Sequence, residues 1–143
     1  KGTDIREGLK AWHFMLGLLV LTLVVVRIVA RLMKEKPAIV PEPAAWQRLL
    51  ANVTHFALYA FMVAMPLAGW TILSAAGKPI PFFGLELPAL VAPDKDLAGQ
   101  IKELHELSGT IGYYLIGLHA AAALFHHYII KDNTLIRMLP GTR

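Results

Sequence analysis

The sequence predicts an all-α membrane protein in which a bundle of transmembrane helices forms a single domain over residues 1–143. Hydrophobic residues account for 56% of the chain and charged residues for only 17%, whereas soluble domains carry about a quarter. Three apolar stretches are long enough to cross a bilayer, which takes roughly 20 residues of helix. They span about residues 11–32, 46–76 and 102–130.

The lysines and arginines stand at the ends of these stretches. There they anchor helices at the membrane surface, so the net charge of +4 does not indicate a nucleic-acid partner. Eight of them flank the connection after the first span and the tail 131–143, and six lie on the other side. This excess predicts a cytoplasmic connection and tail, and an external loop over residues 77–101. Lys1 is then outside, so we expect one further helix upstream, which would complete a four-helix bundle.

The chain contains no cysteine. This excludes disulfides, thiolate metal sites, iron–sulfur clusters and covalent haem attachment through C-x-x-C-H. Histidine is the strong nitrogen ligand present in quantity, with six residues, four of which lie well inside the predicted spans. Ionisable side chains are costly in hydrocarbon, so histidines placed there require a functional explanation.

His105 and His119 lie 14 residues apart on the third predicted helix. At 100° per residue they project within about 40° of each other, and at 1.5 Å per residue they are about 21 Å apart along the axis. Two histidines on one face at two depths are suited to hold two stacked b haems across a membrane. Gly109 and Gly112 are expected to leave room for a flat macrocycle beside His105.

His13 lies near the outer end of the first span, at the depth of His105. These two histidines are therefore predicted to be the axial ligands of one outer haem iron. Gly17, one turn after His13, would give that haem room. His55 and His119 also lie at comparable depths, and the partner of His119 stays open.

Other interpretations compete with haem ligation. A histidine in an apolar helix is commonly a hydrogen-bonded packing residue, and small residues commonly serve only close helix packing. His126 and His127 lie near the cytoplasmic interface, where they are either interfacial anchors or part of a quinone site or proton relay. Arg27 and Arg31 are predicted to reach the interface as anchors, with a haem propionate as the alternative contact.

Several blocks of the chain resemble the bacterial cytochrome b561 family, and the similarity covers almost its whole length. The blocks are Trp12-His13 with the run to Arg31, His55 to Tyr59, Met65 to Gly69, Leu104-His-Glu, Gly117-Leu-His-Ala-Ala-Ala-Ala-Leu-Phe-His-His-Tyr128, and Lys131-Asp-Asn-Thr-Leu. The histidine-rich block near the C-terminus is specific, whereas apolar runs alone are not.

This resemblance implies a four-helix bundle in the bacterial inner membrane with two b haems, each held by two histidines. It also implies oxidation of superoxide on the periplasmic side and reduction of ubiquinone. By position, His13 and His105 would hold the outer haem, and His119 one side of the inner haem. The family's second inner ligand sits on a first helix that this sequence lacks, with His55 as the fallback. His127 matches a family histidine near the quinone end.

Two histidines per iron leave no open coordination position, so the expected chemistry is outer-sphere electron transfer. Three other functions stay open at this point. The chain could be a cytochrome b subunit that carries electrons from a periplasmic dehydrogenase or hydrogenase to quinone, a small transporter with a histidine relay, or a structural membrane adaptor. The last two would have no haem spectrum.

Overall fold

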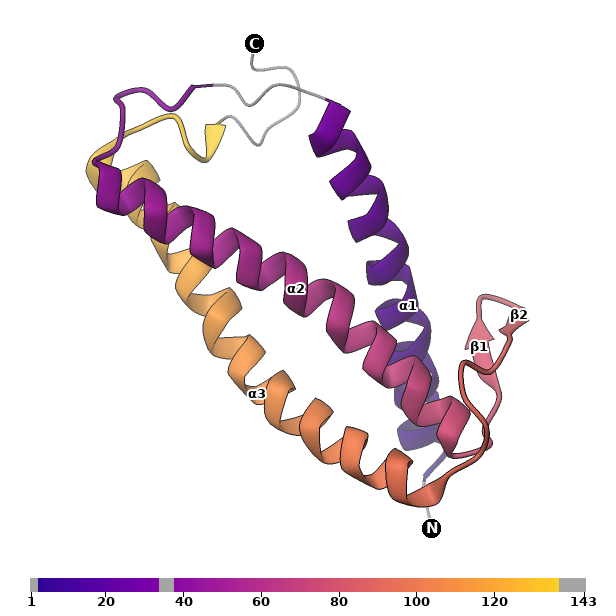
Figure 1. The fold of residues 1–143 in the computed structure, drawn as a ribbon. Coiled ribbons are helices and arrows are strands. Elements are labelled where there is room, and N and C mark those ends of the chain that lie inside the picture. The colour runs from indigo at the N-terminus through magenta and orange to yellow at the C-terminus, as the bar shows by residue number, and fades with distance from the viewer. Residues whose placement is uncertain (1–2, 34–37, 137–143) are drawn as a thin grey trace.

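The structure, a computed structural model, describes residues 3–33 and 38–136. Within these residues α2 packs against both α1 and α3, so it is the central helix of the bundle (Figure 1). The three long helices and the single π-helical turn that continues the last of them are α1 (Asp4–Met33), α2 (Ala45–Ala75), α3 (Lys95–Phe125) and η1 (His126–Ile130).

A two-stranded antiparallel hairpin separates α2 from α3 in the sequence. It consists of β1 (Ile80–Phe82) and β2 (Leu85–Leu87), and it lies beside the start of α1 and the end of α2 (Figure 1). We call this end of the bundle the hairpin end, and the end that carries η1 the opposite end. The hairpin is the one departure from the all-α prediction among the residues described.

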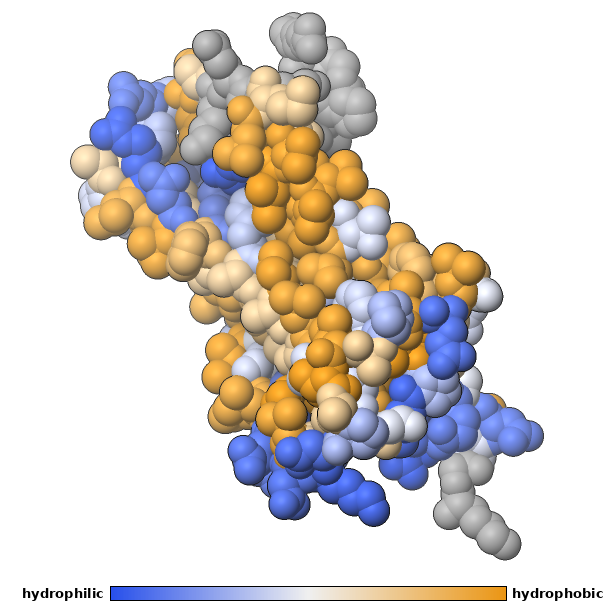
Figure 2. Space-filling model, turned by 45° about the vertical axis from the view of Figure 1, so that its right-hand side comes forward, coloured by the Kyte–Doolittle hydropathy of each residue, from blue (hydrophilic) through white to orange (hydrophobic). Residues whose placement is uncertain are grey.

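All three helices are long and apolar enough to cross a membrane. In the most apolar window of each helix, only 11%, 6% and 6% of the residues are buried inside the protein. A helix in a water-soluble bundle buries its apolar face against the rest of the protein. These helices leave most of their apolar surface exposed, so that surface needs an apolar surrounding. Figure 2 shows apolar side chains over the middle of the visible face and hydrophilic ones gathered toward its ends. The predicted transmembrane bundle with three spans is confirmed.

The antiparallel helices α2 and α3 pack through large residues on one helix and glycines on the other. The ring of Phe61 lies so close over Gly112 that an added Cβ there would stand 2.1 Å from the ring's Cζ. One turn along, a Cβ added to Gly109 would stand 3.7 Å from the terminal carbon of Met65. Glycine allows this close approach because it has no side chain. The two contacts fix the register of α2 against α3.

A small apolar core lies at the hairpin end, where the hairpin packs against α1 and α2. The segment after the hairpin is held to α2 by three hydrogen bonds, one of them from the N–H of Asp94 to the carbonyl of Ala75 at 2.8 Å and the other two through side chains of α2. The indole N–H of Trp70 donates to the carbonyl of Pro88 at 2.9 Å, and the hydroxyl of Ser74 accepts from the N–H of Leu90 at 3.0 Å. The buried and partly buried members of the core are Leu18, Leu73, Ile80, Phe14, Trp70, Phe82 and Leu87.

The loop predicted over residues 77–101 is more regular than expected. The hairpin turn at Phe83 and Gly84 has φ values of 47° and 87°, both positive, as a two-residue type I′ turn requires. α3 begins at Lys95 rather than near residue 102, because the side chain of Asp94 caps it by accepting the N–H groups of Asp96 and Leu97 at 3.0 Å. The first turns of α3 are polar, so the apolar pattern alone placed its start too late.

Polar contacts close the opposite end of α3. After η1, Lys131 has a φ of 59° and the chain turns back. Asp132 is only 4% exposed and places Oδ2 2.5 Å from Nδ1 of His126, while its Oδ1 accepts the N–H of Thr134 at 2.9 Å. Burial by itself raises the pKa of the Asp132 carboxyl, but the hydrogen bonds from His126 and Thr134 outweigh it and hold the pKa below its usual range.

Asn133 joins this end to the connection between α1 and α2. Its side-chain oxygen accepts the N–H of Val40 at 2.9 Å, and its backbone N–H donates to the carbonyl of Val40 at 3.2 Å. Residues 34–37 of the predicted connection and residues 137–143 of the predicted tail lie outside the described part of the chain.

Replacing Gly112 by alanine would put a methyl group into the space of the Phe61 ring. We expect Gly112→Ala to lower the free energy of unfolding by about 1–3 kcal/mol, because the helices must separate to admit it. Thermal unfolding in detergent measures this. Gly117→Ala on the same helix is the control, since nothing lies within 4 Å of a Cβ added there. Equal melting temperatures for the two variants would contradict the close α2–α3 contact.

Asp132→Asn tests whether the contacts of Asp132 with His126 and Thr134 stabilise the chain after α3. The folded-state pKa of Asp132 lies below its ordinary value of 3.8, because its hydrogen bonds favour the charged carboxylate, so its stabilisation is fully present above that value and is lost as the pH falls through the folded-state pKa. We expect Asp132→Asn to cost about 1–3 kcal/mol of unfolding free energy at neutral pH. Melting temperatures of wild type and variant should converge in acid. Asp96→Asn is the exposed control, and a gap that persists unchanged in acid would refute this account.

Candidate functional site

Four histidines form two pairs at two levels of the bundle. Nearer the hairpin end, the rings of His13 on α1 and His105 on α3 have centres 6.1 Å apart and planes at 83°. Further along, the rings of His55 on α2 and His119 on α3 have centres 5.4 Å apart and planes at 75°. The two α3 members are 14 residues apart, which is about 21 Å of helix. The structure thus brings together the histidines whose depths matched in the sequence.

The His13–His105 pair has the spacing of two ligands on one metal ion. An imidazole nitrogen stands about 2 Å from a first-row metal, so two rings on opposite sides of one ion have centres roughly 6 Å apart. Nδ1 of His105 is buried without a hydrogen-bond partner among the described residues, although buried polar atoms nearly always have one. A Cβ added to Gly69 would stand 3.6 Å from Cε1 of His105, so α2 packs closely beside this ring. The ring is held by packing, which fits a metal ligand better than a hydrogen-bonded packing residue.

The His55–His119 pair is tighter. Its centre-to-centre distance of 5.4 Å is shorter than the roughly 6 Å that one ion between the rings requires. The rings meet edge to face, as neighbouring aromatic rings do. An iron between them would need a small separation of α2 from α3, whereas a ligand from elsewhere would leave the pair in contact.

The arrangement in pairs distinguishes between kinds of metal site. No group of three or more His, Cys, Asp or Glu side chains that could hold a metal ion occurs within residues 3–33 and 38–136. A zinc site takes three or four such ligands. Haem iron takes its remaining ligands from the porphyrin and needs only axial ligands from the protein. Two histidine pairs therefore fit haem.

The glycines beside the histidines differ from one another in what they contact. The sequence predicts room for a macrocycle at Gly109 and Gly112. At Gly112 the ring of Phe61 on α2 occupies that space, whereas a Cβ added to Gly109 would make only ordinary contact, at 3.7 Å, with the end of Met65. Gly17, by contrast, has nothing within 4 Å of an added Cβ, so the space one turn from His13 is open.

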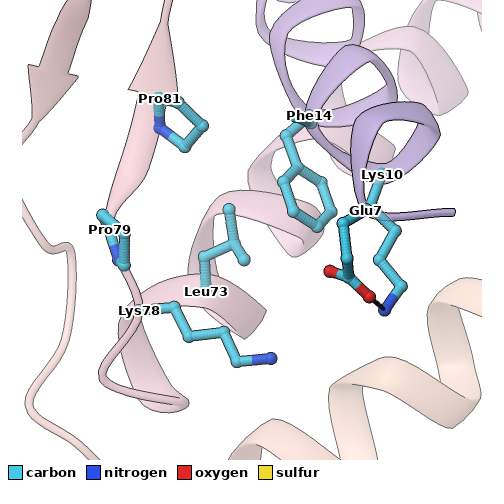
Figure 3. A pocket seen from close by; sticks show the side chains of 8 residues that line it. Glu7, Lys10, Phe14, Leu73, Lys78, Pro79 and Pro81 are labelled. Atoms are coloured by element: carbon cyan, nitrogen blue, oxygen red, sulfur yellow. Dashed lines mark hydrogen bonds and ion pairs between the residues drawn. The ribbon is translucent and has the colours of Figure 1, made fainter. Parts of the chain in front are cut away.

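A cavity of about 220 Å³ opens at the hairpin end (Figure 3). Lys10 forms an ion pair with Glu7 at 2.8 Å, and the ammonium group of Lys78 points toward that pair in Figure 3. The ring of Phe14, also in the lining, meets the ring of His13 edge-on at a centre distance of 6.1 Å. Phe14 therefore separates the cavity from the His13–His105 pair. Its lining is Glu7, Lys10, Ala11, Phe14, Leu73, Lys78, Pro79 and Pro81.

His126 and His127 both lie in η1 but have different surroundings. Asp132 engages Nδ1 of His126, which leaves Nε2 as the ring nitrogen that can meet another partner. The ring of His127 instead lies 4.7 Å from the ring of Tyr128. Single π-helical turns are frequent at functional sites. Asp132 is not among the sequence-based candidates, where it stands only within the Lys131-Asp-Asn-Thr-Leu block of the family resemblance.

Arg27 and Arg31, near the end of α1, both approach Tyr59 on α2. Nε of Arg27 and Nη1 of Arg31 lie 3.1 and 3.4 Å from the phenol oxygen of Tyr59, ten residues into the uncharged stretch of α2 that begins at Leu49. Tyr59 had no role in the sequence argument, and the signal that could have found it is its place one turn after His55.

Comparison with known proteins gives the family. The family described as "Prokaryotic cytochrome b561" matches residues 2–141. The chain is 40% identical over 140 residues to "Cytochrome b561 homolog 1" of Escherichia coli (strain K12), a match that covers 98% of this chain and 80% of that protein. It is 42% identical over 138 residues to "Probable superoxide oxidase CybB" of Yersinia pestis, covering 96% and 78%. It is 35% identical over 128 residues to "Cytochrome b561 homolog 2" of E. coli (strain K12), covering 89% and 68%.

These matches extend over nearly the whole chain and agree with its spanning helices and paired histidines. A family match over residues 2–141 excludes a chance resemblance confined to apolar runs. The chain is a member of the prokaryotic cytochrome b561 family, multi-pass bacterial membrane proteins that bind haem b and transfer electrons.

Proposed function

We propose that this protein oxidises superoxide on the periplasmic side of the membrane and passes the electrons through two b haems to ubiquinone. The observation that carries the proposal is the presence of two histidine pairs at two levels of one helix bundle, about 21 Å apart along α3. The name of the Yersinia pestis relative supports superoxide as the electron donor.

His13 and His105 are the proposed ligands of the outer haem. Haem b, when bound, supplies reversible one-electron chemistry. The two imidazoles would hold the haem iron, and the chemistry that the bound group would supply is outer-sphere electron transfer. The open space at Gly17, one turn from His13, gives a macrocycle room.

His119 is the proposed ligand of the inner haem. The family resemblance implies that its partner is a histidine on an upstream helix. The 5.4 Å contact between His55 and His119 is too short for an ion between unmoved rings, which favours the upstream partner over His55.

The cavity at the hairpin end is the proposed donor site. Superoxide is a small anion, and the cavity carries Lys10 and Lys78 against one carboxylate, Glu7. Lys10 is already paired with Glu7, so Lys78 contributes the net positive charge. Phe14 stands between the cavity and His13, so an anion held there would lie close to the outer ligand pair. Each superoxide gives up one electron and leaves as molecular oxygen.

The opposite end, with His126 and His127, is the proposed quinone end. Reduction of ubiquinone to quinol takes two electrons, from two superoxide anions, and two protons. A proton carrier is therefore needed beside the quinone oxygens. His126 suits this role, because Asp132 holds Nδ1 and so orients Nε2.

Alanine substitution of the ligands tests the haem assignments through the reduced-minus-oxidised absorption spectrum of purified protein. His13→Ala and His105→Ala should each lose the outer haem and keep the inner one. His119→Ala should lose the inner haem, and His55→Ala should keep it if the partner lies upstream. His127→Ala, outside both pairs, should keep both signals. A wild-type protein without a b-type spectrum would end the proposal, and two intact haems in His13→Ala would end the pairing.

Lys78→Gln tests the donor site. With one attracting charge removed, the second-order rate of haem reduction by superoxide should fall about two- to fivefold at low ionic strength and approach wild type at high salt. Rapid mixing with superoxide measures the rate. Lys102→Gln is the matched control, since Lys102 pairs with Glu106 at 3.0 Å and does not line the cavity. If superoxide fails to reduce the wild-type haems, it is not the donor. Equal rates for both variants would place its entry elsewhere.

A further inference from the structure

Two arginines and a tyrosine meet inside the membrane-spanning part of the bundle. Nε of Arg27 donates to the Tyr59 oxygen at 3.1 Å, and Nη1 of Arg31 donates to the same atom at 3.4 Å. The guanidinium carbon of Arg31 also lies 5.3 Å from the centre of the Tyr59 ring. Tyr59 is ten residues, about 15 Å of helix, beyond the first residue of the uncharged stretch of α2. Tyr59 is thus well inside the uncharged stretch of α2, and the two arginines reach it from the last turns of α1, which ends at Met33.

Counting donors and acceptors leaves this cluster in need of an acceptor. Guanidinium groups carry five N–H donors each and no acceptor, and a phenol carries one O–H donor. The Tyr59 oxygen accepts from both arginines, so its own O–H is left to donate. Several of the remaining donors can be satisfied by one oxyanion, whose oxygens accept several hydrogen bonds at once.

Among the described residues, no carboxylate forms an ion pair with the arginines of the cluster. The ion pairs found there are Lys10–Glu7, Arg48–Glu42, Lys102–Glu106 and His126–Asp132, and none includes Arg27 or Arg31. Two cations bonded to a neutral phenol at this depth are costly in hydrocarbon, and such residues normally face a partner charge. A single anion bound by both would remove this cost.

We propose that Arg27, Arg31 and Tyr59 form an intramembrane binding site for an oxyanion, a carboxylate or a phosphate. Two sources offer this chemistry: a propionate of the inner haem and the phosphate of a membrane lipid. The propionate source rests on the proposed function. It is favoured by position, because Tyr59 lies one turn from His55, whose ring contacts that of His119. The depth of Tyr59 in the span also suits a haem substituent better than a lipid headgroup.

The test uses the purified full-length protein with its haems and its co-purifying lipids. Arg27→Gln removes one charge, and Tyr59→Phe removes only the hydroxyl. Their matched controls are Arg48→Gln, in an exposed ion pair with Glu42, and Tyr114→Phe, a largely exposed tyrosine of α3. Redox titration followed optically gives the midpoint potential of each haem, and the outer haem serves as the internal reference. Phosphorus analysis and native mass spectrometry report bound anionic phospholipid.

If the anion is a propionate, Arg27→Gln should shift the reduction equilibrium of the inner haem toward the oxidised form by about tenfold, or about 59 mV for one electron. Tyr59→Phe should shift it in the same direction by less, and the outer haem and both control variants should stay unchanged. If the anion is a lipid phosphate, both potentials should stay and the two variants should lose a bound phospholipid that the controls retain.

Unchanged potentials together with unchanged lipid in Arg27→Gln would overturn the site. A wild-type protein without haem would refute the proposed function alone, since the lipid measurement would still test the site.

Discussion

The close packing of α2 on α3 is the contact on which the rest of the arrangement depends. Phe61 lies over Gly112 and Met65 faces Gly109, so the two antiparallel helices have one register. That register sets His55 beside His119 and Gly69 beside His105. Small residues permit such contact in a membrane, where helices gain little from apolar burial and depend on packing. The relative depths of the histidines on α2 and α3 thus depend on glycines that are not themselves proposed ligands.

Polar groups in the bundle follow a second constraint, that each must find a partner where water is scarce. At the opposite end this is achieved within the chain, since Asp132 engages His126 and Thr134. At the hairpin end Ser74 and Trp70 bond the backbone of the segment after the hairpin. The exception among the described residues is informative, because the buried Nδ1 without a partner belongs to His105, a residue proposed to be a ligand.

Sequence periodicity and composition were enough to predict the three spans and the pairing of histidines by depth, because both depend on distance along a helix. His105 and His119 share a face for this reason alone. The start of α3 at Lys95 was not predictable from apolar pattern, since its first turns are polar and only the Asp94 cap marks it.

Contacts between helices were the harder part. Gly112 was expected to make room for a macrocycle, but its space belongs to Phe61 on a different helix. The hydrogen bond from Arg27 to Tyr59 was likewise not predicted. Each outcome depends on the rotation and register of neighbouring helices, which one-dimensional spacing does not contain. The assignment of haem therefore rested more on the family resemblance than on helix geometry deduced from the sequence.

His13 and His105 are separated by 92 residues, and the whole of α2 lies between them. A group bound by both histidines would close a long loop of the chain. It would stabilise only the folded protein, because the two rings are far apart in an unfolded chain. Assembly of the outer site must therefore follow the insertion of α3. Under the proposed assignment, a nascent chain that stops earlier would have no complete site to fill, so haem binding would separate finished from unfinished molecules during biogenesis.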